Sequence, residues 1–372
     1  LSVENLKTHF HTHEGTVKAV DGASFEVNRG ETVCIVGESG SGKTVACESL
    51  TKLISMPPGE MSGNIWFDAV LPRWQTPDGG VRNTAIEDSA IPVREDGMMN
   101  LAALSKTQLH EIRGGHIGHV FQNPQGALDP VYTVGQQIIE TIRLHRDEKA
   151  KARERAIDLL DRVGIPDASS RIDEYPHEFS GGMRQRVVIA MALAADPDLL
   201  IADEPTTALD VTIQAGILRL LDELKDDLDM AIVFVTHDLG VVAEIADRVV
   251  VMYAGKVMER GGVYELFENP AHPYTQALFA CLPEQGKEMN AIGGSFPDPK
   301  DPPEGCRFHP RCPHAIDACA TGEQPPLEGV NGTTQTASCV FYGPEYDEST
   351  VRGPAHKGTA PTGAERADGG TE

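Results

Sequence analysis

The fold of this 372-residue chain is decided by Gly37-Glu38-Ser39-Gly40-Ser41-Gly42-Lys43-Thr44, which follows the pattern G-x-x-x-x-G-K-[ST]. The stretch lies between an apolar run at 31–36 and a helical pattern at 42–54. A buried strand, a glycine-rich loop and a helix N-terminus present backbone N–H groups to an anion, which the helix dipole also attracts. We therefore expect a phosphate-binding loop (P-loop), in which Lys43 reaches the β- and γ-phosphates of a nucleotide and Thr44 binds Mg²⁺.

Strand and helix patterns alternate along the chain beyond this loop. Short apolar runs at 199–202 and 231–235 are typical of buried parallel strands, whereas 150–163, 182–195 and 211–224 have helical spacing. This alternation predicts an α/β fold with a mainly parallel sheet. No run approaches the roughly 18 apolar residues that a membrane helix requires.

Two adjacent carboxylates, Asp203 and Glu204, follow the apolar run at 199–202. Ligands of parallel sheets gather at the carboxyl ends of the strands. We therefore expect Asp203 to hold Mg²⁺, directly or through water, and Glu204 to polarise the attacking water as a general base. The alternative is a pair of helix-capping residues before Pro205.

A second anion site is predicted where Ser180 and two glycines open a helix, in Phe179-Ser180-Gly181-Gly182-Met183-Arg184-Gln185-Arg186. This segment resembles the signature of ABC ATPases, usually L-S-G-G-Q. The resemblance implies a head-to-tail dimer in which Ser180, Gly181 and Gly182 contact the γ-phosphate of ATP held by the partner's P-loop. Met183 stands where the family has Gln, which bears on the contacts of that glutamine and not on the glycine-lined anion site.

Four further positions resemble features of the same family, in the same order. Gln122 resembles the Q-loop glutamine that senses Mg²⁺ and faces the permease, and Asp210 ends a segment similar to the D-loop. His237 resembles the switch histidine that contacts the γ-phosphate. Phe10, upstream of the first core strands, is a candidate to stack on adenine; taken singly, such residues are more often turn or core residues. The resemblance covers about 1–260 and implies a RecA-like P-loop NTPase core with an ABC β-subdomain and a helical subdomain.

Changes in composition suggest the domain boundaries. Residues 1–261 form the predicted ATPase domain, with its helical subdomain at about 124–185 and an inserted surface loop at about 68–100, where periodicity is lost. Residues 262–342 form a Cys-rich C-terminal extension. Residues 343–372 are polar and Gly-rich, which predicts a disordered tail.

Four cysteines mark the C-terminal extension, separated by five, six and nineteen residues: Cys306, Cys312, Cys319 and Cys339. Their surroundings, and the segment Asn269-Pro270-Ala271-His272-Pro273-Tyr274-Thr275, resemble the extension of oligopeptide and dipeptide importer ATPases. That resemblance implies a [4Fe–4S] cluster in some members. Four thiolates can hold such a cluster or tetrahedral Zn²⁺. We expect the cluster first, zinc second and unligated thiols third, with His309 and His314 as further possible zinc ligands.

The charge of the chain restricts its partners. There are 56 Asp and Glu against 32 Lys and Arg, a formal net charge of -24. Such a surplus repels phosphate backbones, so we expect no nucleic-acid partner. It also suggests a salt-rich cytoplasm, with an ordinary acidic protein as the alternative.

Together these features predict the ATP-hydrolysing subunit of an ABC importer of dipeptides, oligopeptides or related solutes, with ATP and Mg²⁺ as cofactors. The resemblance implies two transmembrane permease subunits, an extracytoplasmic substrate-binding protein and a second ATPase subunit, identical or paralogous. The chain would then lie at the cytoplasmic face of the membrane as a peripheral subunit. Nickel and sugars are alternative cargoes. A non-transport ABC ATPase and an Fe–S sensor that uses ATP only as a ligand are the alternative functions.

Overall fold

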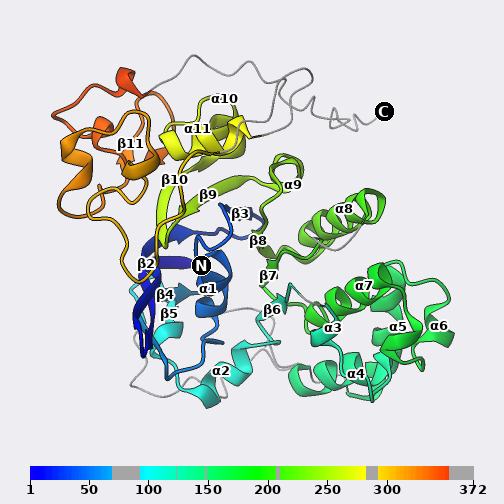
Figure 1. Ribbon diagram of the computed structural model, residues 1–372. Helices are drawn as coiled ribbons and strands as arrows, with labels where there is room; N and C mark the ends of the chain where they lie inside the picture. Colours follow the sequence, from blue (N-terminus) through cyan, green and yellow to red (C-terminus); the bar gives the residue numbers. More distant parts are fainter. Residues whose placement is uncertain (69–92, 123, 147–148, 207–209, 282–291, 352–372) are drawn as a thin grey trace.

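Two β-sheets and a lobe of helices make up the described part of the chain (Figure 1). The structure, a computed structural model, describes residues 1–68, 93–122, 124–146, 149–206, 210–281 and 292–351. In spatial order, the strands of the larger sheet are β11 (Glu328–Gly329), β12 (Thr336–Ala337), β10 (Lys256–Gly262), β9 (Arg248–Tyr253), β3 (Thr32–Val36), β8 (Ala231–Val235), β7 (Leu199–Asp203) and β6 (Ile117–Val120).

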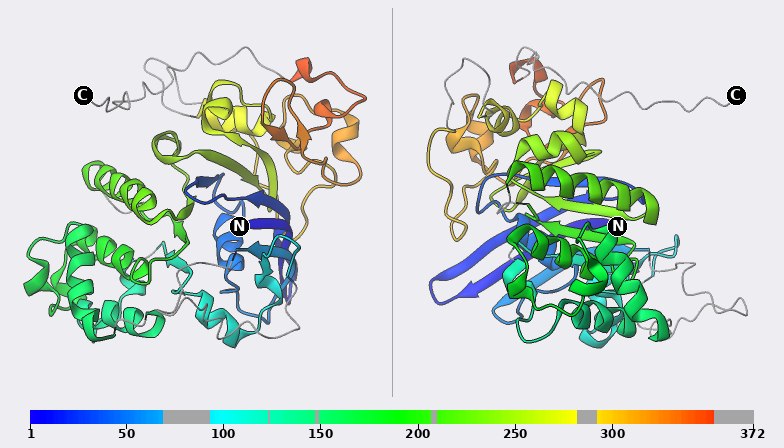
Figure 2. Two further views of the ribbon diagram at one scale, coloured as in Figure 1. Left: turned by 180° about the vertical axis from the view of Figure 1, so that it is seen from behind. Right: turned by 90° about the vertical axis from the view of Figure 1, so that its right-hand side faces the viewer.

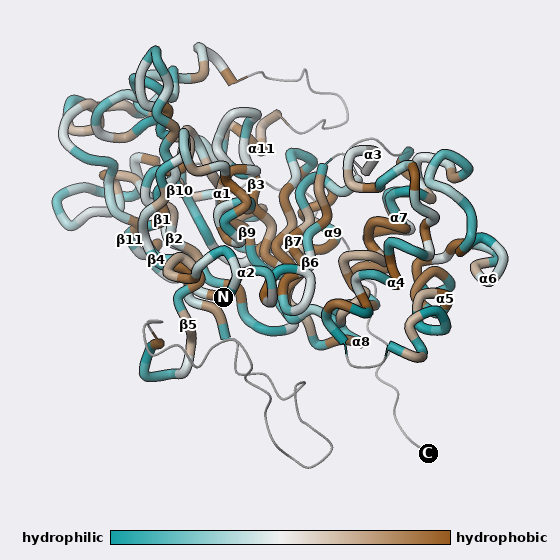
Figure 3. Tube along the Cα trace, turned by 90° about the horizontal axis from the view of Figure 1, so that it is seen from below, coloured by the Kyte–Doolittle hydropathy of each residue, from teal (hydrophilic) through white to brown (hydrophobic). Residues whose placement is uncertain are grey.

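The centre of the larger sheet is parallel, as the sequence predicts, and it is covered on both faces. Strand β3 pairs in parallel with β8 and β9, and β7 pairs in parallel with β8 and β6. Along β3, Val33 and Ile35 pack into one hydrophobic cluster, while Cys34 and Val36 pack into the other. Burial on both faces explains why these strands are apolar without alternation. Figure 3 shows hydrophobic colouring along these central strands and also on helices of the lobe.

A smaller antiparallel sheet lies against the larger one. Its core residues Leu6, Phe25 and Ile65 share a hydrophobic cluster with Val33 and Ile35 of β3. In spatial order, its strands are β2 (Gly15–Glu26), β1 (Ser2–Thr12), β4 (Gly59–Phe67) and β5 (Met99–Asn100).

The helices fall into three groups. Those of the lobe stand to one side of the sheets in Figure 1 and in the left view of Figure 2, and they are α3 (Pro124–Ala127), α4 (Val134–His145), α5 (Ala152–Arg162), α6 (Ala168–Arg171) and α7 (Gly181–Ala192). The lobe has an apolar centre to which Ile138, Leu160 and Val187 contribute. The helices that accompany the sheets are α1 (Lys43–Leu50), α2 (Lys106–Ile112), α8 (Val211–Leu228) and α9 (Leu239–Ile245). The C-terminal helices are α10 (Val263–Glu268) and α11 (Pro273–Ala280).

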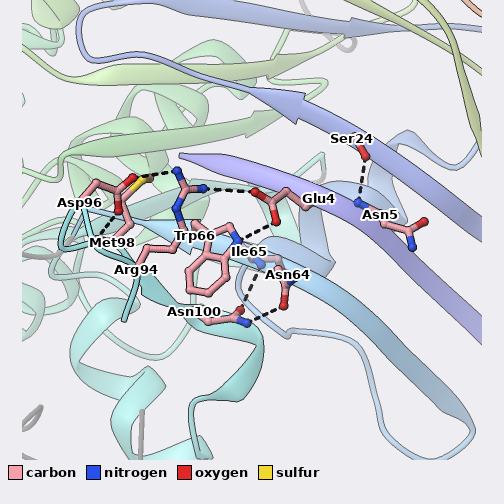
Figure 4. A network of polar contacts seen from close by, with 10 residues as sticks. All are labelled: Glu4, Asn5, Ser24, Asn64, Ile65, Trp66, Arg94, Asp96, Met98 and Asn100. Carbon is pink, nitrogen blue, oxygen red and sulfur yellow. Dashed lines mark hydrogen bonds and ion pairs between the residues drawn. The ribbon is translucent and has the colours of Figure 1, made fainter. Parts of the chain in front are cut away.

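The insertion predicted at about 68–100 ends earlier than predicted, because Met99 and Asn100 already belong to the smaller sheet. Residues 69–92 lie outside the described residues, but Met99 and Asn100 pair with β4 as strand β5. Glu4 accepts hydrogen bonds from Trp66 Nε1 at 2.9 Å and from Arg94 Nη1 at 3.2 Å, which joins β1, β4 and the returning chain (Figure 4). The C-terminal side of the insertion is therefore part of the smaller sheet's edge, because these polar groups tie it back to β1 and β4.

The C-terminal segment packs on the sheets as part of the same core. Strand β12 pairs with β10, and Phe308 belongs to the hydrophobic cluster that also contains Val36. The predicted disordered tail is wrong for 343–351: Val351 is buried, and its carbonyl accepts a hydrogen bond from Gln276 Nε2 at 2.7 Å. Residues 352–372 lie outside the described residues. Within the described ranges, none of the helices combines the length and apolar character that crossing a bilayer demands.

Candidate active site

The loop between β3 and α1 can be built only from glycine at two positions. Gly37 has φ +150° and Gly42 has φ +99°, a region that residues with a Cβ rarely adopt. A Cβ on Gly37 would collide with the carbonyl oxygen of Met252, and one on Gly42 with that of Ala19. The loop is thus held between β9 and β2, with its backbone at the N-terminus of α1.

The Lys43 ammonium lies inside this loop. It donates to the carbonyl oxygens of Gly37 at 2.8 Å and Glu38 at 3.0 Å. Burial lowers the pKa of Lys43, while the nearby carboxylates of Glu204 and Asp203 oppose that shift. A buried ammonium satisfied by carbonyls can transfer these hydrogen bonds to an anion that enters the loop.

Asp203, the last residue of β7, meets the first turn of α1. The Thr44 hydroxyl bonds its carboxylate, while burial, and next the charge of Glu204, raises the pKa of Asp203. One oxygen, Asp203 Oδ1, is buried without a hydrogen-bond partner. Mg²⁺ binds oxygen ligands such as carboxylates and hydroxyls, together with phosphate oxygens and water. The unpaired buried oxygen of Asp203 and the hydroxyl of Thr44 are ligands of this kind, so these two residues fit the ion.

Glu204 is the meeting point of three segments that are distant in the sequence. It accepts a hydrogen bond from Gln122 Nε2 at 2.8 Å, and His237 Nδ1 lies 3.0 Å from its other oxygen. Its backbone N–H donates to Val235 O at 2.9 Å, and its φ is +46°. Gln122 follows β6 and His237 follows β8, so the carboxyl ends of three adjacent strands bring these side chains together.

The signature segment lies apart from this cluster, at the start of α7. Ser180 is the N-cap of α7 and accepts from Met183 N at 3.4 Å. Gly181 is exposed, and a Cβ there would meet nothing within 4 Å, whereas one on Gly182 would press on Ile213 at 3.0 Å. Across the described ranges, no hydrogen bond joins this segment to the P-loop of the same chain.

Two predicted site residues have environments that the sequence did not indicate. Asp210 caps α8 by accepting from Ile213 N at 3.0 Å, while the rest of the predicted D-loop, 207–209, lies outside the described residues. Phe10 lies within β1 of the smaller sheet, which precedes β3, the first strand of the larger sheet. Its ring packs over Gly59 of β4, where a Cβ would lie 3.4 Å from Phe10 Cε1. The 2–26 hairpin that contains Phe10 was not predicted from its residue pattern.

The four cysteines of the C-terminal extension are neighbours in space. Cys306 N donates to Cys319 O at 2.9 Å, and burial raises the pKa of Cys339 to about 12, with smaller effects from the other three thiols. Cys306, Cys319 and Cys339 are buried and Cys312 is half-buried. Of the described residues, however, no group of three or more His, Cys, Asp or Glu is arranged to hold a metal ion. In this part of the chain the thiols thus lie near one another without forming a preformed metal site.

In the part of the chain that the structure describes, neither His309 nor His314 belongs to a group of residues arranged to hold a metal ion. His309 Nδ1 lies 2.9 Å from the carbonyl oxygen of Cys306. His272, which the sequence did not single out as a ligand, has its Nε2 4.0 Å from Cys306 Sγ. His272 is fully buried, and burial lowers its pKa to about 3, so it is neutral at physiological pH.

Sequence reasoning also missed a contact between the C-terminal extension and the P-loop. Arg311 Nη1 donates to both carboxylate oxygens of Glu38 at 3.1 Å, and Tyr274 OH accepts from Glu38 N at 2.9 Å. These partners lie more than 230 residues from Glu38 along the chain. No local spacing signals such a pair.

Comparisons with known proteins agree on the type of protein. A family model described as "ABC transporter" matches residues 20–207, and one described as "Oligopeptide/dipeptide transporter, C-terminal region" matches residues 258–319. A putative peptide import ATP-binding protein of Brucella abortus (strain 2308) is 47% identical over 342 residues, covering 89% of this chain and 94% of the relative. The oligopeptide transport ATP-binding protein OppD of Bacillus subtilis (strain 168) is 44% identical, covering 92% of this chain and 89% of the relative.

Solved structures agree with the family models on the fold. The dimeric structure of a bacterial ABC transporter cassette has a TM-score of 0.56 and 25% identity, covering 70% of this chain and 98% of that one. A post-hydrolysis cassette dimer bound to ADP and Pi has the same TM-score, identity and coverage. The predicted ABC cassette fold is therefore confirmed.

Proposed function

The chain belongs to the ABC transporter family of ATP-binding cassettes, and from this premise we propose that it powers the import of peptides or related solutes. The observation that carries the proposal is the cluster of Gln122, Glu204 and His237 beside the P-loop, in a chain that also matches the oligopeptide/dipeptide transporter C-terminal region. The curated relatives named for peptide import span nearly the whole chain. Nickel or sugar import and a non-transport ATPase are the alternatives.

ATP hydrolysis would use the residues around β3, β7 and β8. The backbone N–H groups of the P-loop and the Lys43 ammonium would hold the phosphates. Thr44, Asp203 and Gln122 would hold Mg²⁺, which when bound neutralises charge developing on the phosphate oxygens. Glu204 would accept the proton of the attacking water, and His237 would contact the γ-phosphate.

A complete site requires a second cassette. Of the signature residues, Ser180 and Gly181 are exposed and Gly182 is buried, and in the described ranges none of them is hydrogen-bonded to the P-loop of its own chain. We propose that they and Met183 contact ATP on a partner cassette, with Asp210 near the interface and Phe10 beside the adenine. The partner would be a second copy or a paralogue, and binding of two ATP molecules would close the pair.

The remaining proposed partners follow from the importer role. They are two transmembrane permease subunits, contacted by the helical lobe, and an extracytoplasmic substrate-binding protein. The chain would be peripheral, at the cytoplasmic face of the membrane. The surplus of acidic residues, with a net charge of -24, supports a salt-rich cytoplasm and argues against nucleic acid.

The cysteines carry a separate proposal: a [4Fe–4S] cluster, with zinc second. The mutual proximity of the four thiols supports it, whereas the absence of a preformed ligand group in the described ranges opposes it. Iron, sulfide and zinc would be measured on protein purified anaerobically, with a visible spectrum. Iron and sulfide at four each per chain support the cluster, stoichiometric zinc supports the second proposal, and neither metal rejects both.

The function is tested in two steps. The purified chain should hydrolyse ATP, and Lys43→Ala should abolish nucleotide binding while leaving the unfolding midpoint close to that of the wild type. The complex with its permease and binding protein should then be purified and reconstituted, and ATP turnover measured with added di- and oligopeptides. Stimulation by peptides supports peptide import, whereas stimulation only by nickel or a sugar selects that alternative. If the chain hydrolyses ATP but associates with no membrane subunit in the cell, a non-transport ATPase is favoured.

A further inference from the structure

Arg311 of the C-terminal extension is buried against the nucleotide-binding loop, with its side chain 4% exposed. Its Nη1 donates to both carboxylate oxygens of Glu38 at 3.1 Å and to Tyr253 OH at 3.1 Å. Its Nε and Nη2 donate to the carbonyl oxygens of Gly293 at 2.8 Å and Ile292 at 3.1 Å. The guanidinium is therefore held in one orientation, with every nitrogen bonded, and it faces the second residue of the P-loop.

A second group from the C-terminal segment reaches the same residue. The hydroxyl of Tyr274, which is fully buried, accepts from Glu38 N at 2.9 Å. The Tyr274 ring lies 4.6 Å from the Tyr253 ring, which in turn lies 5.0 Å from Phe296. A Cβ on Gly40 would lie 3.6 Å from the Phe296 ring. The extension thus fixes both the side chain and the backbone of Glu38 and borders the loop two residues later.

Glu38 also touches the residue that is to bind phosphate. Its carbonyl oxygen accepts from Lys43 Nζ at 3.0 Å. The polar contacts therefore run from Arg311 through Glu38 to Lys43, and a change in the position of Glu38 would change the carbonyl cradle of the ammonium. The contact of Arg311 Nη1 with both oxygens of Glu38 is charge-assisted, and such hydrogen bonds are stronger than those between neutral groups.

We propose that Arg311 is a positioning residue for ATP binding: it holds Glu38, and thereby the P-loop, in the conformation that accepts nucleotide phosphate. Arg311 acts through Glu38 and touches no nucleotide itself. The inference rests on the proposed ATPase function, and it assigns the C-terminal extension a direct effect on the affinity of the ATP site.

The test compares Arg311→Met, Arg311→Lys, Glu38→Gln and the Arg311→Met/Glu38→Gln double variant in the full chain. Dissociation constants for ADP with Mg²⁺ are measured by equilibrium binding, and kcat and KM by ATP hydrolysis. Arg311→Met and Glu38→Gln should each raise KM and the ADP dissociation constant by about five- to tenfold, with kcat within about twofold. Arg311→Lys should recover part of the loss, because an ammonium keeps the charge beside Glu38 but not the hydrogen bonds of Nε and Nη2 that orient the guanidinium. The double variant should be no weaker than the weaker single variant.

Arg307→Met is the matched control. Arg307 is also buried in the extension, but it donates to Asp21 and to Ala254 O rather than to Glu38. An equal rise of KM in Arg307→Met and Arg311→Met, or additive effects in the double variant, would overturn the proposal. If Arg311→Met does not fold, Arg311→Lys and Glu38→Gln carry the test, and unchanged affinity in both overturns it. A wild type that binds no ATP refutes the proposed function instead.

Discussion

At the scale of single residues, the end of β7 concentrates the chemistry. Asp203 is buried with an orphaned oxygen, whereas Glu204, one position on, turns out of the strand at φ +46° toward Gln122 and His237. The two adjacent carboxylates thus have different surroundings. That of Asp203 suits binding of a cation, and that of Glu204 suits accepting a proton. Environment rather than residue type separates their proposed roles.

Glu204→Gln should abolish turnover while retaining ATP binding. The amide keeps the size of the side chain and its neighbours, but it cannot accept a proton from water, so we expect kcat to fall by about 10²–10⁴-fold. ATP hydrolysis and equilibrium ATP binding are measured on the same preparation. Glu223→Gln, an exposed change on α8, is the control. Turnover within twofold of the wild type would refute Glu204 as the base and favour a protein that uses ATP only as a ligand.

At the scale of elements, the two glycines at the start of α7 differ in whether packing within the chain requires a glycine. A Cβ on Gly182 would press on Ile213, so packing within the chain accounts for that glycine. Gly181 has open space around it, and folding of this chain does not require a glycine there. A close approach of this backbone to a nucleotide on the partner cassette would explain the glycine at position 181.

Gly181→Ala should therefore reduce activity without a loss of stability. We expect the unfolding free energy to stay unchanged or rise by up to ~1 kcal/mol, because alanine favours a helix over glycine. The added methyl group should disturb the contact with the partner's nucleotide and lower ATP turnover by roughly tenfold or more. Chemical denaturation and ATP hydrolysis are measured together, with Gly329→Ala, also in open space, as the control. Full activity would remove the signature glycine from the proposed dimer site.

Another element-scale feature is the junction between β10 and α11. Glu259 is fully buried, and its carboxylate accepts from the backbone N–H groups of Ala271 and His272, both at 2.8 Å. Burial raises the pKa of Glu259 from 4.5 to about 7, although these hydrogen bonds oppose the shift. Below pH 4.5 the group is neutral in both states; as pH rises to about 7, only the unfolded chain ionises readily.

The contribution of Glu259 to stability should therefore be greatest below pH 4.5 and be lost as pH rises through about 7. Unfolding free energies of the wild type and Glu259→Gln would be measured by denaturant titration between these pH values and above. The unfolding free energy of the wild type minus that of Glu259→Gln should decrease as pH rises, since glutamine does not titrate. A difference that is constant or increases with pH would show that the pKa of Glu259 is not raised.

At the scale of the whole molecule, one hydrophobic cluster runs from the helical lobe across the larger sheet into the C-terminal extension. Ion pairs join the extension to the smaller sheet, through Arg307 and Asp21, and to the P-loop, through Arg311 and Glu38. The folded chain as a whole carries a net charge of -24, whose self-repulsion opposes compaction. Salt screens this repulsion.

Raising KCl from about 0.1 M to about 1 M should raise the thermal unfolding midpoint by several degrees, since the screening length falls from about 10 Å to about 3 Å. Scanning calorimetry or circular dichroism measures the midpoint, and sucrose at matched osmolality serves as the control for solute exclusion. An unchanged midpoint in KCl would reject adaptation to a salt-rich cytoplasm and leave an ordinary acidic protein.

The ABC cassette fold was implied by the resemblance of the ordered motifs to ABC ATPases, whereas the residue pattern by itself determined the P-loop and the parallel sheet. These features depend on neighbours in the chain: glycines at required spacings, apolar runs of strand length and residues that open helices. Such signals are local because backbone geometry and amphipathic periodicity act over a few residues. The return of 99–100 to the smaller sheet and the order of 343–351 were not predicted, because distant partners stabilise them. The hairpin at 2–26 was also missed, although its two strands are neighbours in the sequence.

Only the tertiary structure decided which polar groups meet. Gln122 and Glu204 are 82 residues apart and share a hydrogen bond because β6 and β7 are adjacent in the sheet. Arg311 and Glu38, 273 residues apart, meet because the extension folds back over β9 and the P-loop. Sequence spacing carries no information about such pairs. Their contact depends on how the sheets and the extension pack, which is set by burial over the whole chain.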